Sequence, residues 1–379
     1  MTAYFFNRRS RRTGALPDLA PEGGEPIAFH RRFPAYAPSP LVSLPKVASR
    51  LGLGRVFVKN ESSRFGLPSF KLLGASWATY RALQARLGGS LDRWTSLEEL
   101  AAEVSPLKPF LLAAATDGNH GRAVARMARL LGFGARIFVP QGTSSARIRA
   151  IENEGASVTV VDGDYDAAIE RSAQEACGNC LVIDDISWPG YEEIPRWVVL
   201  GYGTIFREIE EQIAFRPSVV FVPIGVGALG AAAVDFYKRE DGTVVVGVEP
   251  ESAACVLASL REGALVTVPG PHDSIMAGLN CGTPSSIAFP TLLAGLDACV
   301  AVADSFAEEA MRTLASNGIV SGETGAAALA GLEALLELPE APEIRRDLGL
   351  DARATVLLLV TEGATDPESY ERIVGRPPR

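Results

Sequence analysis

The chain has 379 residues, of which 47% are hydrophobic and 21% charged, values typical of a soluble globular protein long enough for two domains. Its formal net charge of -9 argues against general nucleic-acid binding, which needs clustered positive charge. One basic cluster, at Arg8, Arg9, Arg11 and Arg12, is expected to form a solvated N-terminal arm. Because the sequence shows neither a secretory signal nor about 18 consecutive apolar residues, we expect a cytoplasmic protein without membrane association.

Strand-like and helix-like segments alternate from about residue 109 onward. The first predicted strand, 110–115, is followed by a helix that ends at Leu131. Further strands are predicted at 135–140, 157–162, 181–185, 218–223, 243–248, 298–303 and 355–360, with helices at 144–154, 164–176 and up to about 239. Continuous β-branched runs between helices indicate parallel sheets covered on both faces, so the predicted fold class is α/β. Ligands bind at the carboxyl ends of such strands, which makes the residues after each strand functional candidates.

The first candidate, Lys71, stands among apolar residues at the start of a predicted helix, in the segment 68–75. Burial and the positive end of the helix are both expected to lower the pKa of its amine and make it nucleophilic. An isolated lysine on a helix is more often one that keeps its ammonium group in water, so this motif alone is weak.

A second candidate segment, 116–122, follows the first strand and contains Asp117, Asn119 and His120 between two glycines. Asn119 can offer an amide to a ring hydroxyl, and Asp117 can offer a carboxylate. A capped strand-to-helix turn explains the same residues equally well. His120 is expected to cap or pack rather than to act as a base.

A glycine-rich segment after the strand 218–223 leaves backbone N–H groups available at a helix N-terminus, which is a phosphate-binding arrangement. The spacing of Gly225, Gly227 and Gly230 also matches the dinucleotide fingerprint, with Glu249 near the position of the ribose-binding acid. A nicotinamide-dependent oxidoreductase is therefore an alternative. The expected phosphate-binding amides are those of Gly225, Val226, Gly227, Ala228 and Leu229.

Two threonines complete the candidate residues. Thr324, at the start of an Ala/Leu-rich helix, could contact cofactor or substrate, although helix capping explains it equally well. Thr361 follows the last strand, and its hydroxyl can form a hydrogen bond with a pyridine nitrogen or simply belong to a polar turn.

The five cysteines stand at positions 177, 180, 255, 281 and 299. Cys177 and Cys180 form a C-x-x-C pair, but no second pair at metal-binding spacing accompanies it, so we expect no metal site. Cys255 and Cys281 flank segments that we expect near the active site, and they are predicted to lie close together.

In order and spacing, these motifs resemble the fold type II (tryptophan synthase β-like) pyridoxal-phosphate enzymes, from about Pro40 to Arg372. Within that class the sequence is most similar to diaminopropionate ammonia-lyase. The segments that carry this similarity are the Lys71 motif, 115–122, 185–191 with 194–195, 275–279, 322–325 and 361–366. Departures at 186–187, 189 and 364 leave the charged positions intact. An acid at position 117 is notable because threonine dehydratases usually have an uncharged small residue there.

The resemblance implies pyridoxal 5'-phosphate, bound to Lys71 as a Schiff base, and no metal. It implies that Asn119 binds the cofactor's 3-hydroxyl, that the amides of 225–229 bind its phosphate and that Thr361 meets its ring nitrogen. Lys71 and Asp117 would be bases on opposite faces, Asp185 would bind or orient the substrate's β-ammonium group, and Thr324 would contact substrate. The sequence leaves open which of the two carboxylates, Asp117 or Asp185, is the base and which binds substrate.

The activity implied is α,β-elimination of 2,3-diaminopropionate, as the D and L forms, to pyruvate and two ammonia molecules through aminoacrylate. Alternatives are a serine or threonine dehydratase of the same fold, the oxidoreductase named above, and a non-catalytic amino-acid-binding regulatory module. The expected domains are a large cofactor-binding domain, 1–75 with 185–379, and a small domain, 76–184. A homodimer that binds a small amino-acid substrate is expected.

Overall fold

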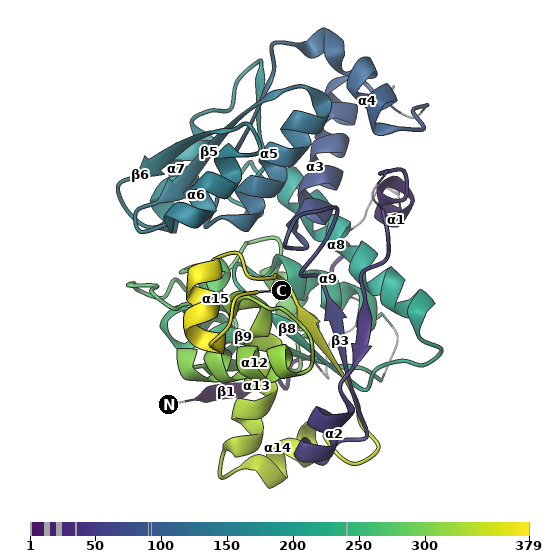
Figure 1. Cartoon of the computed structure of the whole chain (residues 1–379), viewed down its shortest axis with the longest axis vertical. Coiled ribbons are helices and arrows are strands. Elements are labelled where there is room, and N and C mark those ends of the chain that lie inside the picture. Colours follow the sequence, from purple (N-terminus) through teal and green to yellow (C-terminus); the bar gives the residue numbers. More distant parts are fainter. Residues whose placement is uncertain are drawn as a thin grey trace. The chain divides into compact units, whose positions relative to one another are not determined.

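The computed structural model describes residues 2–10, 16–19, 25–34, 36–89, 91, 93–239 and 242–378. The chain divides into two compact units (Figure 1). Unit 1 consists of Met1–Leu19, Pro38–Ser63 and Ile205–Arg379. Unit 2 consists of Ala20–Ala37 and Arg64–Thr204.

Unit 1 is built on a seven-stranded sheet with strand order β1-β10-β9-β8-β11-β3-β2. The central strands are parallel, whereas β1 and β2 at the two edges run antiparallel to their neighbours. Strands β8, β10 and β11 are buried along their whole length, as their continuous apolar sequences require. The strand bounds are β1 Ala3–Phe6, β2 Leu41–Ser43, β3 Arg55–Asn60, β8 Val219–Pro223, β9 Val244–Pro250, β10 Ala298–Val302 and β11 Thr355–Val360.

Helix α13, Glu323–Glu337, packs against the strands of this sheet and is buried almost throughout. Its small residues allow this close approach, since a Cβ added at Gly331 would lie 2.5 Å from a side-chain atom of Val248. The other helices of unit 1 are α2 Pro45–Leu51, α9 Ala228–Tyr237, α10 Cys255–Glu262, α11 Phe289–Gly295, α12 Asp304–Ser316, α14 Ala341–Leu348 and α15 Pro367–Val374.

Unit 2 contains a four-stranded parallel sheet with strand order β6-β5-β4-β7. Helix α3 packs on α5, and α7 packs on β4 and β5. The strands are β4 Leu111–Ala115, β5 Gly134–Pro140, β6 Ser157–Val161 and β7 Cys180–Val182. The helices are α1 Pro26–His30, α3 Lys71–Arg86, α4 Leu97–Glu103, α5 Asn119–Leu131, α6 Ser145–Glu152 and α7 Tyr165–Ala173, and α8 Glu193–Gln212 continues from unit 2 into unit 1.

The predicted α/β class with mostly parallel sheets is confirmed, and so are the predicted strands from residue 110 onward. Strands β1, β2 and β3 were not predicted, because the first two are short and β3 mixes charged with apolar residues. The expected domain boundaries differ from the two units in where 20–37, 64–75 and 185–204 belong. Helix α3 is continuous from Lys71 and packs on α5, so the whole helix belongs to unit 2.

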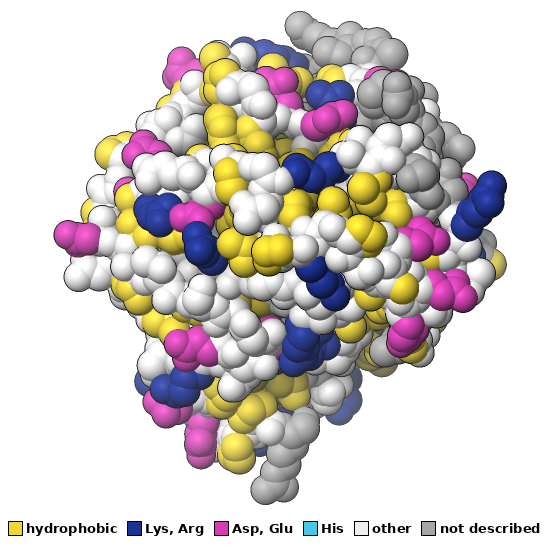
Figure 2. Space-filling view, turned by 90° about the horizontal axis from the view of Figure 1, so that it is seen from above, with side chains coloured by type: hydrophobic (Ala, Val, Ile, Leu, Met, Phe, Trp, Pro, Cys, Tyr) yellow, Lys and Arg dark blue, Asp and Glu magenta, His cyan; other side chains and the backbone are white. Residues whose placement is uncertain are grey.

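Basic and acidic side chains are interspersed on the face shown in Figure 2, without a large patch of a single charge. Arg8 and Arg9 are exposed, as predicted for a solvated basic cluster, and the Arg9 guanidinium also donates to the carbonyl oxygen of Leu260 at 2.7 Å. Arg11 and Arg12 lie outside the described residues. Within the described chain, no helix combines the length and hydrophobicity that crossing a bilayer requires.

Candidate active site

Three of the predicted site residues come together in unit 2. Strands β4 and β7 are neighbours, and Asp117 and Asp185 follow their carboxyl ends by two and three residues. Lys71 is the first residue of α3, as predicted, and its Nζ lies 2.7 Å from Oδ2 of Asp185. Only 4% of the Asp185 side chain is exposed, so the carboxylate and the ammonium group meet in a largely dry environment.

The charges of this pair alter each other's pKa. Burial by itself lowers the pKa of Lys71, but the carboxylates of Asp185 and Asp117 raise it, and the net direction is upward. The expectation of a lowered pKa was therefore wrong for the free amine, because it left out the carboxylates. Burial alone raises the pKa of Asp185, yet the adjacent Lys71 ammonium lowers it well below its usual range. Asp185 thus stays ionised.

Asp117 shows the opposite behaviour. Burial raises the pKa of its carboxyl group, the negative charge of Asp185 raises it further, and the opposing effects of Arg147 and Lys71 do not cancel this. Two carboxyl groups of one site therefore have pKa values displaced in opposite directions, the usual arrangement when one stays charged and the other exchanges protons.

His120 and Tyr165 also approach Asp185, although the sequence did not assign them a site role. His120 Nε2 lies 2.6 Å from the carbonyl oxygen of Ile183, so this nitrogen carries the hydrogen, and Nδ1 lies 3.9 Å from Asp185 Oδ2. Burial lowers the pKa of His120, which keeps the ring neutral. The Tyr165 hydroxyl lies 3.4 Å from Asp185 Oδ1. No local sequence signal links Tyr165, at the start of α7, to the strand ends.

The glycine-rich segment in unit 1 forms the predicted turn into a helix. Helix α9 begins at Ala228, and Gly227 before it has φ +101°, a conformation that favours glycine. In the described part of the chain, the amide N–H groups of residues 225–229 donate to no protein acceptor. Most of these residues are buried, so several unsatisfied donors converge at a helix N-terminus, where an anion is stabilised.

Thr324 and Thr361 lie beside each other in unit 1, close to this turn. The Thr324 Oγ1 accepts a hydrogen bond from the Gly278 amide at 3.1 Å, and the Thr361 Oγ1 lies 3.5 Å from the Thr324 carbonyl oxygen. A Cβ added at Gly225 would lie 3.1 Å from the Gly278 carbonyl oxygen. The glycine turn, Gly278 and both threonines therefore form one continuous cluster.

Glu249 does not offer its carboxylate to a ligand. The side chain is fully buried, and its two oxygens accept the amides of Val256 and Leu257, each at 2.8 Å. The dinucleotide interpretation required this acid for a ribose. Cys255 and Cys281 form no disulfide, but both lie beside Gly225.

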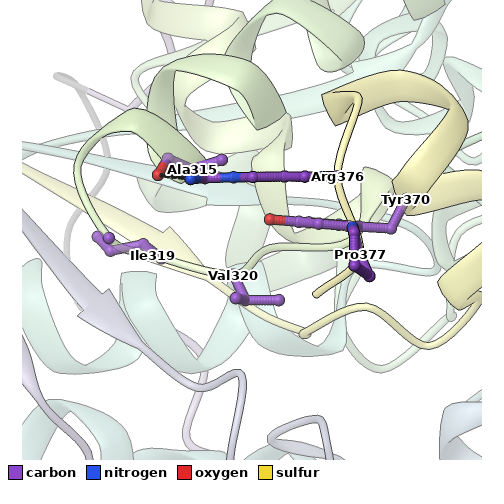
Figure 3. A pocket seen from close by; sticks show the side chains of 7 residues that line it. Ala315, Ile319, Val320, Tyr370, Arg376 and Pro377 are labelled. Atoms are coloured by element: carbon purple, nitrogen blue, oxygen red, sulfur yellow. Dashed lines mark hydrogen bonds between the residues drawn. The ribbon is translucent and has the colours of Figure 1, made fainter. Parts of the chain in front are cut away.

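A surface pocket of about 330 Å³ lies elsewhere in unit 1 and includes no predicted site residue (Figure 3). The guanidinium group of Arg376 donates to the Ala315 carbonyl oxygen at 2.7 Å across one side of it. Its lining consists of Ala315, Gly318, Ile319, Val320, Tyr370, Arg376 and Pro377.

The lysine, the paired carboxylates and the anion-binding turn on parallel sheets define a class that comparison with known proteins identifies. A model of the family described as pyridoxal-phosphate dependent enzyme matches residues 32–362. The chain therefore belongs to the pyridoxal-phosphate-dependent enzymes, with the predicted fold type II architecture and pyridoxal phosphate as its cofactor.

Within this family, the chain groups with the diaminopropionate ammonia-lyases. It is 35% identical to that of Salmonella typhimurium, over 98% of this chain and 97% of the relative. The crystal structure of the Escherichia coli diaminopropionate ammonia lyase in complex with D-serine matches with a TM-score of 0.90 and 32% identity, covering 99% of this chain and 97% of that one. A structure of that enzyme with an aminoacrylate-PLP azomethine reaction intermediate matches with a TM-score of 0.88 and 32% identity, over the same shares of the two chains.

The residues present fit this cofactor. The unsatisfied amides at the start of α9 suit its phosphate, because a helix N-terminus with available N–H groups binds phosphate without further positive charge. The amine of Lys71, on the first turn of a helix, suits its aldehyde.

Proposed function

We propose that the chain converts 2,3-diaminopropionate and water into pyruvate and two molecules of ammonia, and that it accepts both the D and the L form. The similarity to diaminopropionate ammonia-lyases supports this proposal. The observation that carries it is the ionised, buried carboxylate of Asp185 with an ammonium group 2.7 Å away.

The cofactor would be held by one covalent bond, by two polar side chains and by backbone amides. Lys71 would bind it covalently, Asn119 would bind its ring hydroxyl, and Thr361 would meet its ring nitrogen. Its phosphate would be bound by the amides of Gly225, Val226, Gly227, Ala228 and Leu229. The bound cofactor supplies an electron sink for the pair left at Cα when the α-proton is removed.

Asp185 would bind the β-ammonium group of the substrate in the place that the Lys71 ammonium takes in the free chain. A β-ammonium group needs no further proton to leave, because it takes the electrons of the Cβ–N bond and departs as neutral ammonia. A hydroxyl group needs a proton to leave as water, which an ionised carboxylate cannot supply. Asp185 therefore favours loss of ammonia over loss of water.

Asp117 and Lys71 would remove the α-proton from opposite faces of Cα, one base for each enantiomer. The raised pKa of Asp117 makes this carboxylate the more basic of the two acids, which suits proton transfer. Thr324 would contact the substrate. The released enamine tautomerises to an imine, and water hydrolyses the imine to pyruvate and the second ammonia.

The test is a side-by-side assay of purified protein, saturated with pyridoxal phosphate, with D- and L-diaminopropionate, serine and threonine. We expect two ammonia per pyruvate from diaminopropionate and much slower keto-acid formation from the hydroxy amino acids. An absorption band at roughly 410 to 420 nm, removed by borohydride, reports the link to a lysine. Lys71→Ala should lack this band and the activity, and faster turnover of serine or threonine by the wild type would contradict the proposal.

We also propose a cytoplasmic homodimer. The described cysteines form no disulfide, which suits a reducing compartment. Light scattering of the cofactor-bound protein tests the dimer directly, and a monomer mass at micromolar concentration would contradict it.

A further inference from the structure

The regular backbone hydrogen bonding between the parallel strands β4 and β7 ends one hydrogen bond before the segments that carry Asp117 and Asp185. The strands pair as far as Ala113 and Val182, and the amide of Ile183 still donates to the Ala113 carbonyl oxygen at 2.8 Å. In a regular parallel ladder, the Ala115 amide would then donate to the Ile183 carbonyl oxygen. Two side chains replace that bond.

His120 and Asp184 are these side chains. The Nε2 of His120 donates to the Ile183 carbonyl oxygen at 2.6 Å, and the Ala115 amide donates to Oδ1 of Asp184 at 2.7 Å. The Ala115 N–H and the Ile183 carbonyl group, which would otherwise bond to each other, thus both have a hydrogen-bond partner. The strands can therefore separate without leaving a buried polar group unpaired. Asp117 and Asp185 lie directly beyond this opening.

Asp184 is fixed from several sides and is fully buried. Its Oδ2 lies 2.6 Å from Oγ of Ser172 on α7, and its own amide donates to the hydroxyl of Tyr191 at 2.8 Å. That hydroxyl in turn donates to the Val182 carbonyl oxygen at 2.8 Å. One carboxyl group therefore joins the end of β4, the end of β7 and α7.

We propose that Asp184 is a positioning residue for the elimination. Its side chain sets the separation of Asp117 and Asp185 by connecting the ends of β4 and β7 where their backbone hydrogen bonding stops. Ala115 stands two residues before Asp117, and Asp184 immediately precedes Asp185. The hydrogen bond between Ala115 and Asp184 therefore holds the backbone next to each of the two carboxylates. This inference rests on the proposed function, in which the two carboxylates have different tasks.

The hydrogen-bond pattern around Ser172 specifies which substitution preserves the bridge. The Ser172 Oγ also lies 2.9 Å from the Ile169 carbonyl oxygen, and its single hydrogen cannot serve two acceptors. A protonated Asp184 resolves this by donating to Ser172, and burial raises the pKa of Asp184 to about 7. An asparagine amide would donate to Ser172 in the same way, and its oxygen would still accept from Ala115.

The experiment compares Asp184→Asn with Asp184→Ala in the holoenzyme. We expect Asp184→Asn to keep kcat for diaminopropionate within about threefold, whereas Asp184→Ala lowers kcat by about tenfold to a hundredfold with a smaller change in KM, because small misplacements of reacting groups are costly. Asp184→Ala should also shift the pH profile of kcat, and Asp184→Asn should only slightly change it. Equal losses in both variants, or wild-type kinetics in Asp184→Ala, would overturn the proposal.

Two further measurements keep the proposal testable. If Asp184→Ala fails to fold, Ser172→Ala replaces it, because this variant retains the hydrogen bond from Ala115 to Asp184 but removes the one with Ser172. We then expect a smaller shift in the pH profile of kcat, and an unchanged profile would overturn the proposal. The pH dependence of the bound cofactor's absorption needs no substrate and senses the charges beside Lys71. It should shift clearly more in Asp184→Ala than in Asp184→Asn, even if wild-type protein makes no pyruvate from diaminopropionate.

Discussion

The Nζ of Lys71 lies 2.7 Å from Oδ2 of Asp185, so an ammonium group already occupies the position at which we expect the substrate's β-ammonium group. In the proposed function, the substrate's β-ammonium group would present the same charge to the same oxygen as the Lys71 ammonium group does. Removing the charge of Asp185 should therefore affect the diamino substrate far more than a hydroxy amino acid.

Asp185→Asn should lower kcat/KM for diaminopropionate by about 10² to 10³, since it removes one partner of a buried charge pair. The residual turnover of serine should fall by less than about tenfold, because a hydroxyl group carries no charge. The measurement is kcat/KM for both substrates. Asp162→Asn, at an exposed aspartate, is the control. Equal losses for the two substrates would argue against ammonium recognition by Asp185.

Asp117→Asn should reduce turnover of D-diaminopropionate by about 10² to 10⁴, as expected for loss of a general base, and turnover of the L form much less. A base must be ionised, so the D rate should rise with pH through the raised pKa of Asp117, and this limb should disappear in the variant. Rates for both enantiomers from pH 5 to 9 provide the check. Parallel losses for the two enantiomers would refute one base per face.

Gly227→Ala should weaken cofactor binding by at least about tenfold. Its φ of +101° disfavours an L side chain, and the new Cβ would lie 2.8 Å from Cδ1 of Leu292. Titration of the apoprotein with pyridoxal phosphate measures the Kd. Gly203→Ala is the matched control, because no atom lies within 4 Å of its added Cβ in the middle of α8. An unchanged Kd in Gly227→Ala would mean that the turn does not bind the phosphate.

Lys59→Met should destabilise the protein by about 3 to 5 kcal/mol, because Glu208 would keep a buried charge without its partner. The Nζ of Lys59 lies 2.8 Å from Oε2 of Glu208, and both side chains are fully buried in unit 1. Denaturant unfolding of Lys59→Met, Glu208→Leu and the double variant measures the coupling. The double variant should recover much of the loss, and strictly additive losses would contradict a coupled pair.

Stability should fall as the pH rises from about 4.5 to 7, partly through Glu249. Burial raises the pKa of this carboxyl group from 4.5 to about 7, against the opposing effect of its two amide bonds. In this range the folded chain keeps a proton that the unfolded chain has lost, so folding is favoured most at the acid end, by about 3 kcal/mol. Thermal unfolding of Glu249→Gln should show a flatter pH dependence, with the exposed Glu251→Gln as control. A slope equal to the wild type would contradict this.

The parallel α/β core was predictable because continuous apolar runs between turns admit few other structures. The lysine, the glycine turn and both carboxylates were predictable as residues that follow strands or begin helices. What the sequence could not give was their mutual influence. The lowered pKa expected for Lys71 followed from burial alone, whereas its actual direction depends on Asp185, 114 positions away in the chain.

The residues that the sequence missed act through contacts between distant segments. Asp184 lies inside the predicted strand 181–185, and nothing in its neighbours indicates that its carboxyl group accepts the Ala115 amide. Tyr165 is likewise the first residue of a helix, α7, and the sequence of that helix does not indicate a contact with Asp185. Such roles arise from the register of two strands and the direction of one helix, which no local pattern encodes.

Strand β1, Ala3–Phe6, has a practical consequence for handling the protein. It pairs with β10 along one border of the seven-stranded sheet, and Arg261 donates to the Tyr4 carbonyl oxygen at 3.2 Å. Deleting the first six residues would leave the backbone of β10 open to strands of other molecules, the usual start of sheet-mediated aggregation. Shortened versions of the protein should therefore keep strand β1 in place.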